Sequence, residues 1–193
     1  MRIGIVSDIH CNLPGLEQAL AVMGGVDELL CLGDCIFQYR FSNEVVALLQ
    51  ARGAQVILGN HEEDFFAPHG IRARQQSWID PALMNWLAEQ PLRREFRFGD
   101  KTLLMVHSTP WEPRGSYVYP VSPTVQRFAE VDADFVLYGH THTQMVRRVG
   151  RALVINPGSA GDARDHSNGR QLSCAVLDPA TDEVTILDYL DRR

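Results

Sequence analysis

The chain lacks any long uninterrupted apolar run. None approaches the roughly 18 residues that a helix needs to cross a bilayer, so we expect no membrane association. The opening segment, Met1–Ser7, also lacks the charged start, long apolar middle and small-residue cleavage site of a signal peptide. It is typical of a first β-strand instead. These absences predict a cytoplasmic protein.

The sequence has few cysteines and fewer basic than acidic residues. The four cysteines (Cys11, Cys31, Cys35 and Cys174) form no Cys-x-x-Cys pair, which argues against a structural zinc knuckle and favours free thiols. Lysine and arginine number 18 against 24 acidic residues, giving a net charge of −6. Proteins that hold nucleic acid through its phosphates need a basic surface, so we expect no stable nucleic-acid binding. Small phosphate esters stay open as substrates, because bound divalent metals would add local positive charge.

The composition that remains is ordinary for a globular protein. With 193 residues, of which 45% are hydrophobic and 22% charged, the chain can bury a sizeable core. We find no internal repeat, low-complexity tract or linker. The simplest organisation is one domain over residues 1–193.

Apolar runs and turn residues predict an α/β fold. Helices are expected from Pro14, after Ser42, over 62–90 with breaks near Pro68 and Pro81, and over 124–131. Strands are expected over residues 2–7, 28–32, 54–58, 94–98, 102–106, 134–138, 145–149, 152–155, 172–178 and 184–188. The first three strands alternate with helices, and the last four follow one another like hairpins. Two mixed β-sheets, packed as a sandwich with helices on the outer faces, would accommodate this order.

Five of the predicted strands are followed by side chains that bind metals. His140 and His142 come after one strand, two positions apart, so in an extended chain they point the same way. Four further blocks follow other strands: Asp8-Ile-His10, Gly33-Asp34, Gly59-Asn60-His61 and His107. In α/β sheets ligands bind beyond the carboxyl ends of strands. Two carboxylates, one carboxamide and four imidazoles are too many for one tetrahedral zinc and suit two metals that share a carboxylate.

These five blocks, in this order and context, resemble the calcineurin-like metallophosphoesterase superfamily, and in particular its small, minimal phosphodiesterase-type members. The resemblance implies a four-layer fold of that family and a hydrolase acting on small phosphodiesters or phosphomonoesters. By the resemblance, a hydroxide bridging the two metals attacks phosphorus, and His61 stabilises charge or protonates the leaving group. The ligand sets it implies are Asp8, His10, Asp34 and His142 for one metal, and Asp34, Asn60, His107 and His140 for the other.

Several alternatives stay open at this point. Manganese, iron, zinc, nickel and cobalt all suit these ligands. The activity could be a phosphomonoesterase or protein-phosphatase type. Two other classes also stay open. One is a non-catalytic scaffold of the same fold; such members lack the histidine that this chain has at His61. The other is a single-zinc hydrolase of the amidase kind. Diesters are favoured because the sequence shows no large cap domain.

Other residues near these blocks carry weaker predictions. Cys11 and Cys35 are expected to point away as apolar fillers; the alternative is an extra soft ligand or an oxidation switch. Glu62 and Glu63 most simply favour a helix N-terminus. The block Asn156-Pro-Gly-Ser159, followed by Arg164, is expected either to form a plain turn or to approach the phosphate. An aromatic loop with Trp111, Arg114, Tyr117 and Tyr119 is expected to be a substrate wall or to pack against another subunit of a homo-oligomer.

Overall fold

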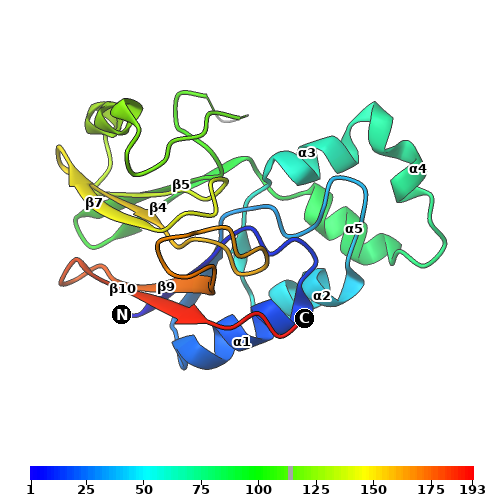
Figure 1. Cartoon of the computed structure of the whole chain (residues 1–193). Coiled ribbons are helices and arrows are strands. Elements are labelled where there is room, and N and C mark those ends of the chain that lie inside the picture. Colours follow the sequence, from blue (N-terminus) through cyan, green and yellow to red (C-terminus); the bar gives the residue numbers. More distant parts are fainter. Residues whose placement is uncertain (113–114) are drawn as a thin grey trace.

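The computed structural model describes residues 1–112 and 115–193, which form two five-stranded mixed sheets (Figure 1). The first sheet has the order β10-β9-β1-β2-β3, in which β1, β2 and β3 are parallel and β9 and β10 antiparallel to their neighbours. Its strands are β1 (Ile3–Val6), β2 (Glu28–Cys31), β3 (Gln55–Val56), β9 (Leu172–Asp178) and β10 (Glu183–Tyr189).

The second sheet has the order β4-β5-β6-β8-β7, with β5, β6 and β8 parallel. Its strands are β4 (Arg93–Phe98), β5 (Lys101–Val106), β6 (Phe135–Leu137), β7 (Met145–Val149) and β8 (Ala152–Asn156). One expectation is corrected here. The pairs β7–β8 and β9–β10 are hairpins as predicted, but β8 and β9 lie in different sheets. The segment between them, from Pro157 to Gln171, carries the chain across the sandwich.

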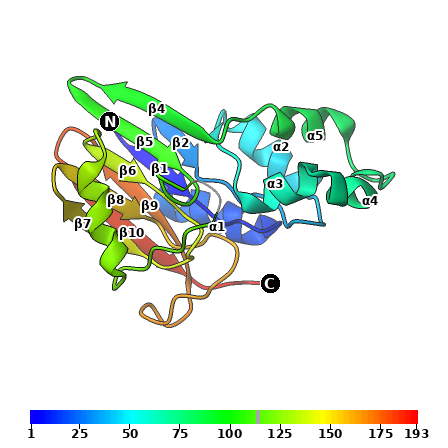
Figure 2. The same cartoon turned by 90° about the horizontal axis from the view of Figure 1, so that it is seen from above.

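Helices cover the outer faces. On the first sheet lie α1 (Leu13–Met23), which begins at the cap Asn12, and α2 (Asn43–Ala51), which begins at the predicted cap Ser42. A 3₁₀ helix, η2 (Pro123–Glu130), lies against the second sheet where a helix is predicted over 124–131. The divided segment 62–90 forms α3 (Asn60–Phe66), η1 (Pro68–Gly70), α4 (Ile71–Arg74) and α5 (Pro81–Ala88), which gather to one side of the sandwich (Figure 2).

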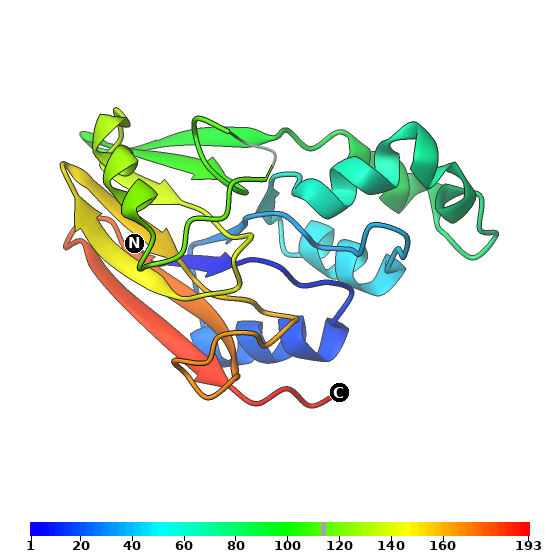
Figure 3. The same ribbon diagram turned by 45° about the horizontal axis from the view of Figure 1, so that its top comes forward.

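The two sheets pack through a continuous apolar layer, and this confirms the predicted sandwich. Side chains such as Ile5, Leu30, Met105, Leu137 and Ile155 are almost wholly buried between the sheets. Figure 3 shows the second sheet above the first, with α1 beneath. None of the helices described in the structure is both long and apolar enough to cross a membrane. Hydrophobic burial along this layer fixes the two sheets face to face, and with them the strand ends that carry the predicted ligands.

The backbone turns sharply where these strands end. Five predicted ligands adopt the left-handed conformation, with φ between 48° and 66°: Asp8, His10, Asp34, His140 and His142. For a residue with a Cβ this conformation costs about 1–3 kcal/mol and persists only where surrounding structure imposes it. Each turn aims a side chain into the space beyond the sheets instead of continuing the strand.

Close packing at these turns explains the glycine that precedes His140. A Cβ built on Gly139 would lie 1.9 Å from Ser7 Oγ and 2.7 Å from Asp8 Oδ2. The Gly139 N–H also donates to the carbonyl of His107 over 2.9 Å. Glycine therefore allows the end of β6 to approach the end of β1 closely enough to bring His140 and Asp8 together.

Replacing Gly139 with alanine should consequently destabilise the fold. We expect the free energy of unfolding in urea to fall by about 1–3 kcal/mol, because the added methyl group forces the two strand ends apart. The measurement is the urea midpoint at an unchanged denaturant slope.

Gly25→Ala is the matched control for Gly139→Ala. Gly25 is exposed, its φ is not positive, and a Cβ there would meet nothing within 4 Å. We expect no loss of stability at this position. Equal losses for the two variants would contradict the steric explanation.

Candidate metal centre

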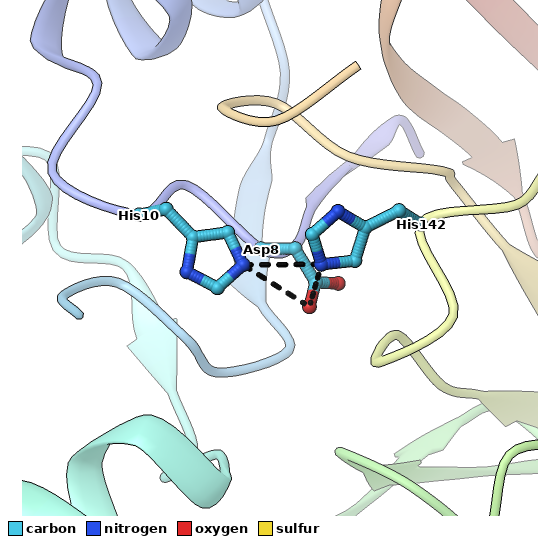
Figure 4. A group of neighbouring side chains, drawn as sticks. All are labelled: Asp8, His10 and His142. Carbon is cyan, nitrogen blue, oxygen red and sulfur yellow. Dashed lines mark hydrogen bonds and ion pairs between the residues drawn. The ribbon is translucent and has the colours of Figure 1, made fainter. Parts of the chain in front are cut away.

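The first group of predicted ligands is Asp8, His10 and His142 (Figure 4). All three are buried, and their facing atoms lie close together. His142 Nε2 is 3.1 Å from His10 Nε2 and 3.3 Å from Asp8 Oδ1. The other ring nitrogen of His142, Nδ1, lies 3.0 Å from the carbonyl of Asp162. A carbonyl only accepts hydrogen bonds, so Nδ1 carries the proton and Nε2 presents a lone pair.

The two oxygens of the Asp8 carboxylate have different surroundings. Oδ2 accepts hydrogen bonds from Ser7 Oγ and from the His140 N–H. Oδ1 faces His10 and His142 and has no hydrogen-bond partner among the described residues, although it is fully buried. A buried carboxylate oxygen opposite an imidazole lone pair is repulsive unless a cation lies between them.

The second group is Asp34, His107 and His140, with Asn60 beside it. His107 Nδ1 donates to the carbonyl of Leu32 over 2.7 Å, so its Nε2 faces inward. That atom lies 3.3 Å from Asp34 Oδ2 and 3.1 Å from Asn60 Oδ1. His140 Nε2 is buried without a hydrogen-bond partner among the described residues. The donor set is again carboxylate oxygen and imidazole nitrogen, with the ligand atoms gathered close together.

Asp34 lies between the two groups. Its side chain is close enough to share a metal with His107 and His140 on one side, and with His10 and His61 on the other. One of its oxygens, Oδ1, also accepts a hydrogen bond from the backbone N–H of His61. Because a carboxylate has several lone pairs on two oxygens, it can serve two cations at once, whereas a neutral imidazole serves one. Its position therefore suits a shared ligand.

Burial and the two carboxylates determine the pKa values of the histidines in this cluster. Burial lowers the pKa of His10 to about 4 and that of His140 to about 4. Burial also acts against charge on His107, but the adjacent Asp34 carboxylate outweighs it and raises the pKa of His107 to about 10. In the absence of another cation, a proton takes the position beside Asp34. A metal ion would compete with that proton for the same lone pair.

The carboxylates stay ionised in spite of their burial. Burial alone would raise the pKa of Asp8 and of Asp34, since it penalises the charged form. The neighbouring imidazoles, His142 for Asp8 and His107 for Asp34, have the opposite effect and lower both pKa values below their usual range. Ionised carboxylates beside buried imidazoles are the forms that bind divalent metals, so the residues fit such ions.

His61 differs from the other histidines in its tautomer. Its Nδ1 accepts a hydrogen bond from the backbone N–H of Gln38 over 3.0 Å, so in the neutral ring the proton is on Nε2. This N–H lies 3.8 Å from Asp34 Oδ2, at the edge of the cluster, and the side chain is 20% exposed. The orientation is that of a hydrogen-bond donor facing the site, whereas the inward nitrogens of His107 and His142 can bind a metal once they lose their protons.

Neither thiol that follows a ligand block takes part in these groups. Cys35 lies 3.5 Å from Cys31, sulfur to sulfur, in the core between β2 and the helices. Cys11 donates to the carbonyl of Arg40. No cysteine belongs to a possible metal-binding group among the described residues. A hydrogen bond to Cys31 and burial raise the pKa of Cys35, and burial raises that of Cys11, so both stay protonated fillers.

Glu62 has a structural role at the site that its sequence position does not reveal. The side chain is fully buried and accepts hydrogen bonds from the backbone N–H groups of Asp34, Ile36 and Gly59, at 2.8, 3.0 and 2.8 Å. Burial and the nearby Asp34 carboxylate raise its pKa to about 7. The spacing from Gly59 to Glu62 suits a helix start, as predicted, but the bonds to the β2 loop depend on tertiary structure.

Asn156 and Ser159 also position ligands. Asn156 Nδ2 donates to the carbonyl of Gly139, and Ser159 Oγ donates to the carbonyl of Asp8 over 2.7 Å. Both side chains are buried. The block that the sequence assigns to a turn or to a phosphate contact therefore secures the chain around Asp8 and His140, while Arg164, further along, is exposed.

The aromatic loop after β5 divides between the core and the site. Trp111 packs against Phe128 and Arg127, on the outer face of the second sheet. Tyr117 stacks on the imidazole of His140, with ring centroids 4.0 Å apart. Arg114, which the sequence also places in this wall, lies outside the described residues. The wall next to the ligands is thus formed by tyrosine.

Glu62→Ala should lower both stability and metal binding. It would leave three buried N–H groups without an acceptor, at a cost of about 1–3 kcal/mol each. We expect the free energy of unfolding to fall by at least about 3 kcal/mol, measured in urea, with a reduced metal content per chain.

Two further variants test this role of Glu62. Glu62→Gln keeps the side-chain shape and one acceptor oxygen, and should lose less stability. Glu17→Ala, at an exposed position of α1, should change stability by less than about 0.5 kcal/mol. The role would be refuted if Glu62→Ala behaved like Glu17→Ala.

Comparison with known proteins agrees with this geometry. The model of the calcineurin-like phosphoesterase superfamily domain matches residues 1–182. A phosphodiesterase of Methanocaldococcus jannaschii is 24% identical, over 82% of this chain and 83% of the relative. An uncharacterised protein of the same organism is 27% identical over 96% of this chain and 86% of its own.

Among solved structures, a metallophosphoesterase from Sphaerobacter thermophilus superposes with a TM-score of 0.77 at 26% identity, covering 100% of this chain and 90% of that one. The fold described above is thus similar to that of a metallophosphoesterase. Since the family model spans nearly the whole sequence, the protein belongs to the calcineurin-like phosphoesterase superfamily and is a hydrolase of phosphoric esters.

Proposed function

We propose that this hydrolase acts on a small phosphodiester, or a phosphomonoester, with two divalent transition metals. One observation carries the proposal. The inward-facing nitrogens of His142 and His107 each lie 3.3 Å from a buried carboxylate, while their outer nitrogens are committed to backbone carbonyls. An imidazole nitrogen that faces a buried carboxylate calls for positive charge, either a proton on the ring or a metal ion in its place, and the two clusters provide two such places.

The ligands divide between the two metals by proximity. Asp8, His10 and His142 would hold one metal, and His107, His140 and Asn60 the other. Asp34 would join both sets. The pair His140 and His142, two residues apart in the turn after β6, would accordingly serve different metals. Mixed nitrogen and oxygen ligands suit manganese, iron, zinc, nickel or cobalt better than calcium or magnesium.

When bound, such metals would neutralise phosphate charge and bring the pKa of a shared water near neutrality. The chain itself supplies the remaining functions. The carbonyls of Leu32 and Asp162 hold His107 and His142 in the ligating tautomer. The Nε2–H of His61, the proton position that the bond from Gln38 selects in the neutral ring, would donate a hydrogen bond to the phosphoryl group or to the leaving oxygen. No protein nucleophile is needed.

A diester is the preferred substrate class. The Methanocaldococcus jannaschii relative that matches most of this chain is a phosphodiesterase. The cavities beside the ligand groups are lined by loops and by residues of α3 and α5, and no cap domain covers the ligands among the described residues. An open site of this kind accommodates a phosphate with two substituents.

The direct test uses metal-reconstituted protein. We expect turnover of bis(p-nitrophenyl) phosphate or p-nitrophenyl phosphate between about pH 6 and 9, abolished by chelation because the buried ligands need their cations. Elemental analysis should give two metals per chain. His140→Ala and His142→Ala should each lower this number by about one.

Three results would count against this function. Failure of both esters with every metal tested would exclude the activity. A content of one metal per chain would favour a single-zinc hydrolase. Loss of both metals from one histidine variant, with the other variant unchanged, would refute the division of ligands.

His61→Ala should separate catalysis from metal binding. Turnover should fall by about 100-fold or more, the usual effect of removing an acid–base group, while the metal content stays near two per chain. If His61 protonates the leaving group, the loss should be larger for an ester that releases an alkoxide than for one that releases p-nitrophenolate, which leaves without a proton.

The control for His61→Ala is His69→Ala, because His69 is an exposed histidine outside the ligand groups. Its removal should leave turnover unchanged. Wild-type turnover by the His61→Ala protein would rule out the proposed role.

A further inference from the structure

A cavity of about 400 Å³ lies against the metal centre on the side of His140. Its walls include Tyr117, Tyr119, Thr143, Arg164 and His166, together with His140 itself. The volume is in the range of sites for small ligands. Because His140 belongs to both the cavity wall and a ligand group, a molecule in the cavity lies next to the reacting phosphate.

The cavity presents aromatic faces that the fold does not use. Tyr117 stacks on His140, and the ring of Tyr119 is nearly parallel to that of Tyr117, with an interplanar angle of 14° and centroids 6.2 Å apart. Yet Tyr117 is 56% exposed and Tyr119 is 42% exposed. Large aromatic side chains left in water beside a catalytic site offer surface for a ligand, and parallel rings favour a flat one.

Hydrogen bonds hold this part of the loop in place before any ligand binds. Ser108 Oγ donates to the carbonyl of Ser116 over 2.6 Å, and the Tyr119 N–H donates to Ser122 Oγ over 2.9 Å. The Ser122 N–H returns a bond to the carbonyl of Tyr119. Ordered aromatic side chains lose little entropy on binding, which raises the affinity that stacking can supply.

Arg164, another residue of the cavity wall, provides positive charge. Arg164 is 62% exposed and pairs with Asp162 through one guanidinium nitrogen, 2.6 Å from Oδ2. A guanidinium has five N–H donors, so an exposed Arg164 in the cavity wall can contact an anion as well as Asp162. Asp165, the carboxylate of the cavity wall, accepts bonds from the N–H groups of Gln144 and Ser167. The cavity therefore combines flat aromatic faces with a cation.

We propose that this cavity binds the nucleobase of a nucleotide ester. The base stacks on Tyr117 and Tyr119, Arg164 contacts the sugar–phosphate, and the phosphoryl group to be cleaved lies at His140. A planar ring joined through a sugar to a phosphate matches both features of the cavity, whereas a glycerol or simple sugar ester leaves the tyrosines unused. The assignment rests on the proposed phosphoesterase function and names the substrate class for the same site.

The kinetic test compares two diesters with the same leaving group, thymidine 5′-(p-nitrophenyl phosphate) and methyl p-nitrophenyl phosphate. Stacking on one aromatic side chain is typically worth about 10-fold in affinity. We expect Tyr117→Ala and Tyr119→Ala each to lower the ratio of kcat/KM for the nucleoside ester to kcat/KM for the methyl ester by about 10-fold. Tyr117→Phe, which keeps the ring, should retain the preference.

Loss of activity toward both esters in equal proportion would overturn the proposal, since it would show that the tyrosines only support His140. The ratio of the two rates is the decisive quantity, because general damage to the metal centre cancels in it.

A binding experiment tests the proposal without relying on turnover. Calorimetry on manganese-loaded protein compares the non-hydrolysable methylenephosphonate analogue of adenosine monophosphate with the same compound lacking its base. We expect the base to strengthen binding by about 10-fold or more, and Tyr117→Ala to remove the difference. If no ester is hydrolysed but this difference persists, the proposed function fails and the nucleobase site stands.

Equal affinities of the two analogues would refute the nucleobase site, whatever the activity. Sedimentation of the same samples identifies the other occupant of an exposed aromatic pair, a second copy of the chain. A wild-type dimer that dissociates in Tyr119→Ala, with equal affinities for both analogues, would assign the rings to a subunit interface and overturn the proposal.

Discussion

Buried negative charge at the strand ends is the constraint on which the site depends. Asp8 and Asp34 are buried and ionised, and the inward ring nitrogens of His142 and His107 face them, where they bind protons until metal ions replace these. Water is largely excluded, so this arrangement cannot be screened by solvent. It becomes favourable once cations fill the space, and the surrounding structure holds the donors in place before they arrive. Preorganisation of this kind lowers the reorganisation needed for binding and catalysis.

The backbone and its hydrogen bonds hold the ligands in that arrangement. Left-handed turns at Asp8, Asp34 and His140 direct the side chains inward, and Gly139 permits the close approach of β6 to β1. Glu62 and Ser159 then secure the loops through buried hydrogen bonds to the backbone. The apolar layer between the sheets supplies the burial that keeps these strained turns populated.

Local patterns in the sequence were sufficient to predict the strands and the helices near Pro14 and Ser42. They also singled out the residues that the structure brings together in the two groups. Apolar runs and the side chains at strand ends are local properties of the sequence. Contacts between distant segments were not accessible in this way. The pairing that separates β8 from β9, and the three bonds of Glu62, depend on tertiary structure. The histidine tautomers also depend on distant residues. The carbonyl of Leu32 sets the tautomer of His107, and the N–H of Gln38 sets that of His61.

Both ligand groups draw residues from the two sheets at once. Asp8 and Asp34 follow strands of the first sheet, whereas His107, His140 and His142 follow strands of the second. A metal in either group would therefore act as a cross-link between the sheets, comparable to a disulfide that joins distant parts of a chain. Unfolding would have to release the ions, so the lifetime of the folded protein in the cell would track the concentration of free metal.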